Sequence, residues 1–445
     1  MKIKSILFQQ IDNTSLVLFR VLFGLLITLE AWGAIATGWV TRVLVEPKFT
    51  FNFIGFDFLQ YLQGPYMYVH FFIMGVFGIG VMLGYKYKWS ILGYTIFWAC
   101  AYFMQKSSYN NHYYLLLLLC FIMYLLPAHK NFSLDAKNND ALREISMPNW
   151  VRLFIIFQLW IVYTYASVAK FYPDWLDGTF PSLLMKGKQH YYLIGDFLQT
   201  DFAIQSIIYV GILFDMLVVP LLLWKRTRWF FFFFSIFFHL FNSIVFQIGI
   251  FPYMSLAFCL FFFNPKAINK RFLPWKTFYE SDEPKIDIPK YSNLMLAFFG
   301  VWFVIQIALP VRHHFIDSDV LWTDEGHKLS WRMMLRTKNS YVDFRVVNKE
   351  TNKTTYVNTY DYLTHKQHKS LSRPDGIWQM AQFLKKEYAL NGENVAVYAD
   401  AKLSVNGRRH SKFIDETVDL ASAKFEYFKT NPWVLPIPED FYKKK

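Results

Sequence analysis

Lys170 is the residue with the clearest potential for chemistry. It ends an apolar run that begins near Trp150, and a Pro-Asp-Trp turn follows it. An amine at the end of a membrane helix can extend to water. If burial removes it from water, it loses its proton and becomes a base or a nucleophile. Lys170, with Asp174 and Asp177 beside it, is therefore either an interfacial lysine or a catalytic one.

A second set of polar residues lies between two apolar stretches. Asn110, Asn111 and His112 form a short turn there. Their amides and imidazole could donate hydrogen bonds to a developing oxyanion. Asparagine is also common in turns, so a capped hairpin is the alternative interpretation.

A third set follows helical spacing. His239, Asn242 and Ser243 lie at i, i+3 and i+4, on one face of a helix. In lipid such a face must point to the bundle interior or to a cavity. A structural hydrogen bond between helices is the alternative. We interpret Arg20 and Glu30, both in the first apolar segment, as structural.

The sequence gives little reason to expect a metal. His313 and His314 are adjacent and cannot easily bind one ion from a single regular element. Haem would need two histidines at matched depth on facing helices, and no pair among His70, His112 and His239 is compelling. The sequence contains no His-Glu-x-x-His, Cys-x-x-Cys or glycine-rich phosphate loop. We expect no metal cofactor.

The composition is that of a membrane protein. Of the 445 residues, 54% are hydrophobic and 18% are charged, whereas soluble proteins have about 25% charged residues. The net charge of +13 could suggest nucleic-acid binding, but the basic residues lie in short loops between apolar runs. Orientation in a membrane explains that pattern better, so we expect the lipid bilayer as a partner and no nucleic acid. No structural disulfide is expected, because all three cysteines lie inside apolar segments: Cys100, Cys120 and Cys259.

The apolar segments predict a polytopic α-helical bundle of about nine spans, with seven or eight possible. A span needs about 20 residues, and several segments are shorter. Segments 90–105 and 113–127 could form a tight hairpin, and 250–263 could be re-entrant. No cleavable signal pattern is visible, so the first span should remain as an anchor. The predicted spans are 16–36, 66–84, 90–105, 113–127, 150–169, 203–224, 229–247, 250–263 and 292–310.

The loop charges predict the orientation of the bundle. Basic residues gather in alternate loops, at 86–88, 130–143, 225–228 and 266–290. The positive-inside tendency places these loops and the N-terminus in the cytoplasm, in a multi-pass protein that we expect in a bacterial inner membrane. Lys170 and the turn at Asn110–His112 then lie near the outer face, and the chain after Pro310 lies outside.

The C-terminal part differs in kind. The sequence predicts a membrane domain over 1–310 and a small β-rich extracytoplasmic domain over 311–445. In the second part, apolar residues alternate with polar ones, as in strands, and one stretch has the start and stop signals of a helix. The predicted elements are a hairpin of Val342–Val347 with Thr354–Thr359, a helix over Pro374–Leu390, and a strand over Asn394–Val405 that ends at Asn406-Gly407.

Four segments together resemble a known family. They are Ser108–Tyr113, Tyr165–Gly178, Phe238–Tyr253 and Ser330–Arg336. Their order and content resemble the vitamin K-dependent γ-glutamyl carboxylases, in the short microbial form called the HTTM-domain group. The resemblance extends from the first span to beyond Arg336. The chain is shorter than animal members, lacks their disulfide, and has one lysine after Ala169 where they have two adjacent lysines.

The resemblance implies a coupled reaction, that of a carbon–carbon lyase. Reduced vitamin K hydroquinone is deprotonated and oxygenated by O2, the base produced removes a glutamyl γ-proton, and CO2 adds to the γ-carbon while the quinone leaves as its epoxide. By the same resemblance, Lys170 is the base, His112 and Asn111 stabilise the reacting anion, and Trp331 and Arg336 lie near a glutamyl peptide substrate. A hydroquinone hydroxyl is weakly acidic, so its base must be a neutral amine, and lysine becomes neutral most readily on burial.

The resemblance also implies a quinone site, to which we assign Asn110, His239, Asn242 and Tyr253. We expect one cavity near the outer face to be lined by the polar residues Lys170, Asn111, His112, His239 and Asn242, because unpaired polar groups facing lipid are costly. Two alternatives remain. One is a quinol epoxidase that does not carboxylate peptides. The other is a non-catalytic transporter or scaffold, although we find none of the internal repeats expected of a transporter.

Overall fold

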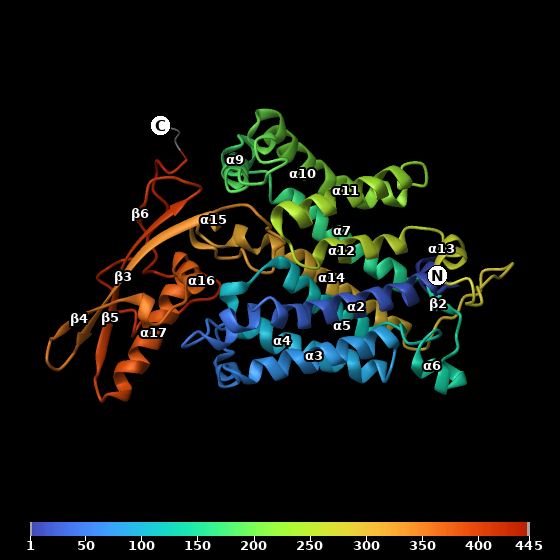
Figure 1. The fold of residues 1–445 in the computed structure, drawn as a ribbon, viewed down its shortest axis with the longest axis horizontal. Helices are drawn as coiled ribbons and strands as arrows, with labels where there is room; N and C mark the ends of the chain where they lie inside the picture. The colour runs from blue at the N-terminus through green and yellow to red at the C-terminus, as the bar shows by residue number, and fades with distance from the viewer. Residues whose placement is uncertain (1, 443–445) are drawn as a thin grey trace.

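The computed structural model describes residues 2–442. Its long helices run side by side, and the C-terminal sheet lies at one end of them (Figure 1). Short elements at the opposite end surround the N-terminus, and β1 pairs there with β2 in an antiparallel ladder. These elements are α1 Lys2–Phe8, β1 Gln10–Asp12, α6 Leu134–Asn138, β2 Ser146–Pro148 and α13 Pro265–Phe272. The other short helices are α8 Pro173–Leu176, α9 Thr179–Lys186, α15 Val320–Thr323 and α16 His365–His368.

Each predicted span coincides with a helix. The helices are α2 Thr14–Ala36, α3 Tyr66–Leu83, α4 Tyr87–Met104, α5 Asn111–Leu125, α7 Trp150–Val168, α10 Asp201–Leu223, α11 Arg228–Phe246, α12 Phe251–Phe258 and α14 Ser292–Val311. Within residues 2–442, six helices are long and apolar enough to cross a membrane: α2, α3, α7, α10, α11 and α14. The predicted count of nine is therefore not confirmed. Helices α5 and α12 are too short, and α4 is long enough but less apolar.

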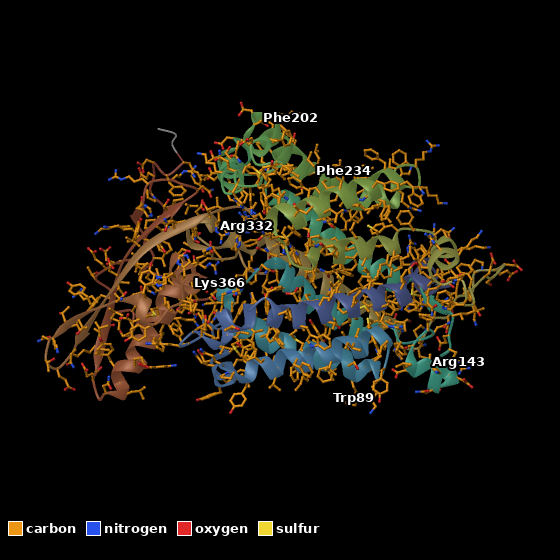
Figure 2. All side chains as sticks on the ribbon, in the orientation of Figure 1. Trp89, Arg143, Phe202, Phe234, Arg332 and Lys366 are labelled. Carbon is orange, nitrogen blue, oxygen red and sulfur yellow. The ribbon has the colours of Figure 1, made fainter. Side chains whose placement is uncertain are left out.

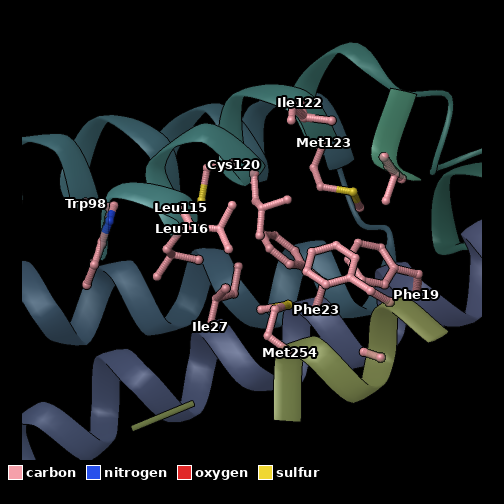
Figure 3. Close-up of a cluster of buried hydrophobic side chains, with 14 of the residues drawn as sticks. Phe19, Phe23, Ile27, Trp98, Leu115, Leu116, Cys120, Ile122, Met123 and Met254 are labelled. Atoms are coloured by element: carbon pink, nitrogen blue, oxygen red, sulfur yellow. The ribbon is translucent and has the colours of Figure 1, made fainter. Parts of the chain in front are cut away.

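Large apolar side chains form the core of the bundle (Figure 3). Phe19, Phe23 and Ile27 on α2 are fully buried and pack against Leu116 of α5 and Met254 of α12. These side chains come from segments far apart in the sequence, so their burial fixes the short helices α5 and α12 against α2. Helix α12 is held in this way by packing although it is too short to span on its own.

Small residues allow α2 and α3 to approach closely. A Cβ on Gly24 would lie 2.3 Å from the backbone nitrogen of Met82, and one on Gly78 would lie 2.4 Å from Oγ1 of Thr28. Close helix contacts of this kind are common in membranes, where small residues permit tight backbone packing. Larger residues at either glycine would push α2 and α3 apart.

The C-terminal elements match the predicted ones closely. The antiparallel sheet has the order β4-β3-β5-β6, and α17 packs against β5. The hairpin, the helix and the strand predicted from the sequence are all confirmed. The observed bounds are β3 Lys338–Asn348, β4 Thr354–Val357, α17 Pro374–Leu390, β5 Val395–Val405 and β6 Ser411–Lys412.

The loop after α2 completes the core beneath this sheet. Phe49 and Phe51 are buried in the same apolar cluster as the strands. Phe49 stacks on Phe383 of α17, with 4.1 Å between the ring centroids. Gln379 donates a hydrogen bond to the carbonyl of Asn52 at 3.0 Å. A loop of the membrane bundle thus belongs to the C-terminal core, and the predicted domain boundary at Pro310 stays a prediction.

Candidate active site

An apolar cavity of about 330 Å³ lies within the bundle. Its walls come mainly from α10, α11 and the segment that follows α7, with two methionines from the C-terminal part. Most wall residues are aromatic or aliphatic, so each polar side chain in the cavity lies in a largely apolar environment. The polar side chains that line it are His112, Tyr163, Lys170, Ser206, Asp215, His239 and Asn242.

Lys170 directs its amine into this cavity. Helix α7 ends at Val168, and a turn then places the lysine against α10. The amine donates hydrogen bonds to the carbonyl of Ala166 at 3.1 Å and to the carboxylate of Asp215. It also lies over the Trp175 ring, 5.5 Å from its centroid. With only 7% of its surface exposed, Lys170 is held inside the protein and does not extend to bulk water.

The turn after Lys170 is clamped by the C-terminal part. Asp174 is buried, and Arg408 donates two hydrogen bonds to its carboxylate, at 2.5 and 2.6 Å. Asn406 adds a third at 2.6 Å. Tyr172 in the same turn donates to the carbonyl of Leu335. The position of Lys170 therefore depends on residues far away in the sequence.

Asp215 is the site residue that the sequence analysis missed. It lies in the middle of α10, is buried, and accepts a hydrogen bond from Lys170. The signal was available, because a carboxylate inside an apolar span is a functional candidate by default. Its partner, 45 residues away, could not be identified from spacing.

Of the four residues assigned to the quinone site, His239 and Asn242 line the apolar cavity, and Asn110 and Tyr253 lie outside it. His239 is buried, and its Nε2 lies 3.1 Å from the hydroxyl of Tyr163. Asn242 lines the apolar cavity on the next turn of α11. Tyr253 does not line it; it is 45% exposed, and its hydroxyl lies 3.1 Å from that of Ser243. Asn110 caps α5 by accepting a hydrogen bond from the amide of Tyr113 and lies outside the apolar cavity.

A second cavity, of about 260 Å³, lies between the bundle and the C-terminal part. In contrast to the first, it is strongly basic, because five cationic side chains and one carboxylate line it. Figure 2 labels one of the five, Arg332, at the boundary between the two parts. The cationic residues are Arg332, Arg336, Lys338, Lys369 and Arg373, and the carboxylate is Asp324.

Asp324 organises these cations. Arg336 donates two hydrogen bonds to its carboxylate, and Lys338 and Arg373 approach it at 2.9 and 3.1 Å. Burial alone would raise the pKa of Asp324, but the surrounding cations, Arg336 first, hold that pKa well below its usual range. Burial, against the opposing effect of Asp324 and with a smaller contribution from Arg336, lowers the pKa of Lys338 to about 8. One carboxylate therefore leaves most of the positive charge unneutralised.

His112 lines both cavities. Its ring stacks on Phe251, with 4.1 Å between centroids. The neighbouring Asn111 lines only the basic cavity, where its amide donates to the carbonyl of Arg332 at 2.9 Å and accepts from the hydroxyl of Tyr109 at 2.9 Å. Four of the five polar residues expected to share one cavity do so, and Asn111 lies in the adjoining one.

The two residues expected near a peptide substrate also differ. Arg336 lines the basic cavity. Trp331 does not: it is 1% exposed and stacks on Tyr114 of α5 at 4.9 Å. Arg332 and Lys338 lie close to Arg336 in the sequence and could have been singled out with it, whereas Lys369 and Arg373 are more than 30 residues further along the chain. Their roles, like those of all the assigned site residues, stay predictions.

A metal site needs a group of His, Cys, Asp or Glu side chains as ligands. Within residues 2–442, no three or more of the His, Cys, Asp and Glu side chains come together as an ion would require. The three cysteines are free.

Comparison with known families accounts for both parts of the chain. A family model described as the HTTM domain matches residues 8–266, and one described as the vitamin K-dependent gamma-carboxylase, lumenal domain, matches residues 291–440. No solved structure matches the chain. With both family models matched in this order over most of its length, the chain belongs to the vitamin K-dependent gamma-carboxylase family.

Proposed function

We propose that the protein oxygenates reduced vitamin K hydroquinone to its epoxide and couples this reaction to CO2 addition at a glutamyl γ-carbon. One observation carries the proposal: His112 stands between an apolar cavity that contains a lysine and a basic cavity that faces the C-terminal part. A lipid-soluble substrate in the first cavity and an anionic peptide in the second would then both reach His112, each from its own binding site.

The apolar cavity suits the hydroquinone. Its volume of about 330 Å³ falls in the usual range for small-molecule sites. Phe202 on α10 and Phe237 on α11 line it and are largely exposed in the protein alone, which leaves them facing lipid (Figure 2 labels Phe202). We infer that the quinone enters sideways from the bilayer at this rim.

Lys170 supplies the base in this proposal. A general base must reach the proton it removes and be unprotonated when it acts. The burial of Lys170, its direction into the cavity and the nearby histidines His112 and His239 support this role. His112, with Asn111 behind it, would stabilise negative charge as it develops, since donors held in a water-poor site act strongly on such charge.

The basic cavity suits a glutamyl side chain. Five cations around one carboxylate favour binding of a further anion, and arginine recognises carboxylates with two parallel hydrogen bonds. Arg336 and Lys338 line this cavity together with His112. We therefore propose that the glutamyl carboxylate binds there, with its γ-carbon toward His112.

The positions of the basic loops and of the C-terminal sheet, at opposite ends of the bundle, support an orientation in the membrane. Basic loops at α6 and α13 lie at the end of the bundle opposite the C-terminal sheet (Figure 1). We propose that this basic end is cytoplasmic and the C-terminal part extracytoplasmic, in a bacterial inner membrane. Reporter fusions at residue 445 and within 225–228 test this orientation, and a reporter active in the cytoplasm at residue 445 would contradict it.

The test of function uses purified protein in lipid nanodiscs with reduced vitamin K, labelled bicarbonate and a glutamyl peptide. Epoxide and fixed label are measured separately. We expect both products from the wild type and neither from Lys170→Ala. Lys188→Ala, which removes a lysine outside the cavity, is the matched control and should retain both activities.

The alternatives give distinct results in the same assay. Epoxide without fixed label would identify a quinol epoxidase that does not carboxylate peptides. Neither product, from protein that is folded in the nanodisc, would reject the enzyme proposal in favour of a transporter or scaffold.

A further inference from the structure

Asp215 is the one carboxylate among the described residues that line the apolar cavity. It lies at mid-length of α10 and accepts a hydrogen bond from Lys170, its single hydrogen-bond partner within residues 2–442. A carboxylate at this depth is expensive to keep in a membrane protein. Because Lys170 is its partner, the role of Asp215 is to be sought in what it does for that amine.

We propose that Asp215 is the positioning residue of Lys170: it holds the amine in the cavity and stabilises the ammonium that forms when the amine takes a hydroxyl proton. The inference rests on the proposed function, in which Lys170 is the base. It adds a residue that acts on the reaction through Lys170.

The proton balance of this step explains the role. The O–H bond of the hydroxyl breaks, its electron pair stays on the oxygen, and an N–H bond forms on Lys170. The total charge in the cavity is unchanged, because the proton moves from one group in the cavity to another. Before the transfer, Asp215 faces a neutral amine; afterwards it faces an ammonium. An unpaired charge is costly in apolar surroundings, so this pairing favours the transfer.

The other groups around the cavity do not replace Asp215. The remaining titratable side chains that line it are His112 from α5, Tyr163 from α7 and His239 from α11. None of them carries negative charge near neutral pH. Removal of the Asp215 carboxylate would therefore leave the Lys170 ammonium without a counter-charge in the cavity.

The first measurement reads the amine directly and needs no turnover. The purified full chain is pulsed with acetic anhydride across a pH series, and acetylation of Lys170 is quantified by peptide mass spectrometry. An opposite charge within about 4–6 Å shifts a proton equilibrium by 1–3 units. In Asp215→Asn the pH at which Lys170 becomes reactive should fall by about one unit or more. Asp201→Asn, at the exposed start of the same helix, should leave it unchanged.

The second measurement is the pH dependence of epoxide formation. In Asp215→Asn the acid limb should move to lower pH with the labelling midpoint. The plateau should fall about tenfold or more, because the amine without its counter-charge is a weaker base. A purely structural role would lower the plateau without moving the acid limb. Asp215→Glu keeps the charge and should return the midpoint toward the wild-type value.

The outcomes separate the inference from the proposed function. An unchanged labelling midpoint in folded Asp215→Asn would overturn the role of Asp215, even if the wild type makes epoxide. Asp215→Ser provides a second neutral variant if Asp215→Asn does not fold. A wild type without epoxide would reject the proposed function, while the labelling midpoint would still decide whether Asp215 stabilises the ammonium.

Discussion

The two cavities that meet at His112 use positive charge in opposite ways. In the bundle, a single lysine, Lys170, lies among aromatic walls and is paired with Asp215. Between the bundle and the C-terminal part, five cations surround one carboxylate, Asp324. The positive charge of a basic side chain is therefore matched by a carboxylate in the apolar cavity, whereas most of the positive charge in the basic cavity has no carboxylate to match it.

The difference indicates two different tasks. A paired amine in apolar surroundings can exchange a proton, because small changes in its environment alter its charge. The five cations around Asp324 instead attract anions. The predictions below test this contrast by removing charge from each cavity or from the junction between them.

The largest effect is expected in the apolar cavity. Lys170→Ala should reduce epoxide formation by about 10²- to 10⁴-fold, because a positioned base contributes that much, and carboxylation should fall with it. Lys170→Arg should be as inactive as Lys170→Ala, since a guanidinium stays protonated. A small amine added to Lys170→Ala should restore part of the rate of epoxide formation. Epoxide yield from reduced vitamin K is the measurement. Undiminished epoxide from Lys170→Ala would remove the lysine from the mechanism.

The next effect concerns the junction of the two parts. Asp375, at the start of α17, lies 2.7 Å from Lys106 of the bundle and 2.6 Å from Lys328. Burial lowers the pKa of Lys106 to about 7, against the opposing effect of Asp375. Asp375→Asn would leave the buried ammonium of Lys106 and the partly buried ammonium of Lys328 without their carboxylate and should destabilise the fold by about 3–5 kcal/mol.

Thermal unfolding of the purified chain measures the Asp375→Asn effect. The exposed Glu350→Gln is the control and should leave the unfolding midpoint nearly unchanged. Adding Lys106→Met to Asp375→Asn should recover part of the loss, because it removes one of the uncompensated charges. Equal midpoints for Asp375→Asn and the wild type would show that this junction contributes little to stability.

A smaller and more selective effect is expected in the basic cavity. Arg336→Gln should raise the KM for a glutamyl peptide by about ten- to a hundredfold, the range for loss of a charge-assisted hydrogen bond. Epoxide formation without peptide should be spared. Steady-state kinetics with and without peptide measure this split, with the exposed Lys353→Gln as control. A parallel loss of peptide-free epoxide formation would show that the cavities are not separate in function.

The smallest effect is a pH dependence of peptide binding. Because burial lowers the pKa of Lys338 to about 8, its positive charge is lost as the pH rises from 7 to 9. An anionic peptide should therefore bind a few-fold more weakly at pH 9 than at pH 7. Fluorescence anisotropy of a labelled glutamyl peptide measures this change. Lys338→Met should bind weakly at both values and lack the dependence, and a wild type with constant affinity would contradict the assignment.

Local patterns predicted the elements well. The start and stop signals of Pro374–Leu390 gave the observed bounds of α17, and every apolar segment proved helical. Such patterns record what a short segment buries, which the segment itself largely determines. They did not determine how many helices cross the membrane, because packing can bury a short helix such as α12.

The site was less accessible to sequence reasoning. Lys170 and His112 could be singled out because polar residues stand out in apolar runs. Asp215 stood out equally and was missed, and Trp331, expected near a peptide, proved to stack inside the bundle. The basic cavity forms where Asn110–His112 of the bundle meet the segments around Arg336 and Arg373. The hydrogen bonds from Arg408 to Asp174 likewise join segments 234 residues apart. No local spacing encodes such partnerships.

The aromatic loop after α2 has a consequence for biosynthesis. Phe49 and Phe51 are translated long before the strands that bury them. During that interval the elements that bury the two rings have not yet been synthesised, so the rings remain accessible to solvent or to chaperones. A chain that stops before α17 would lack the Phe383 ring on which Phe49 stacks. The buried state of this loop can therefore form only after the C-terminal elements have been made.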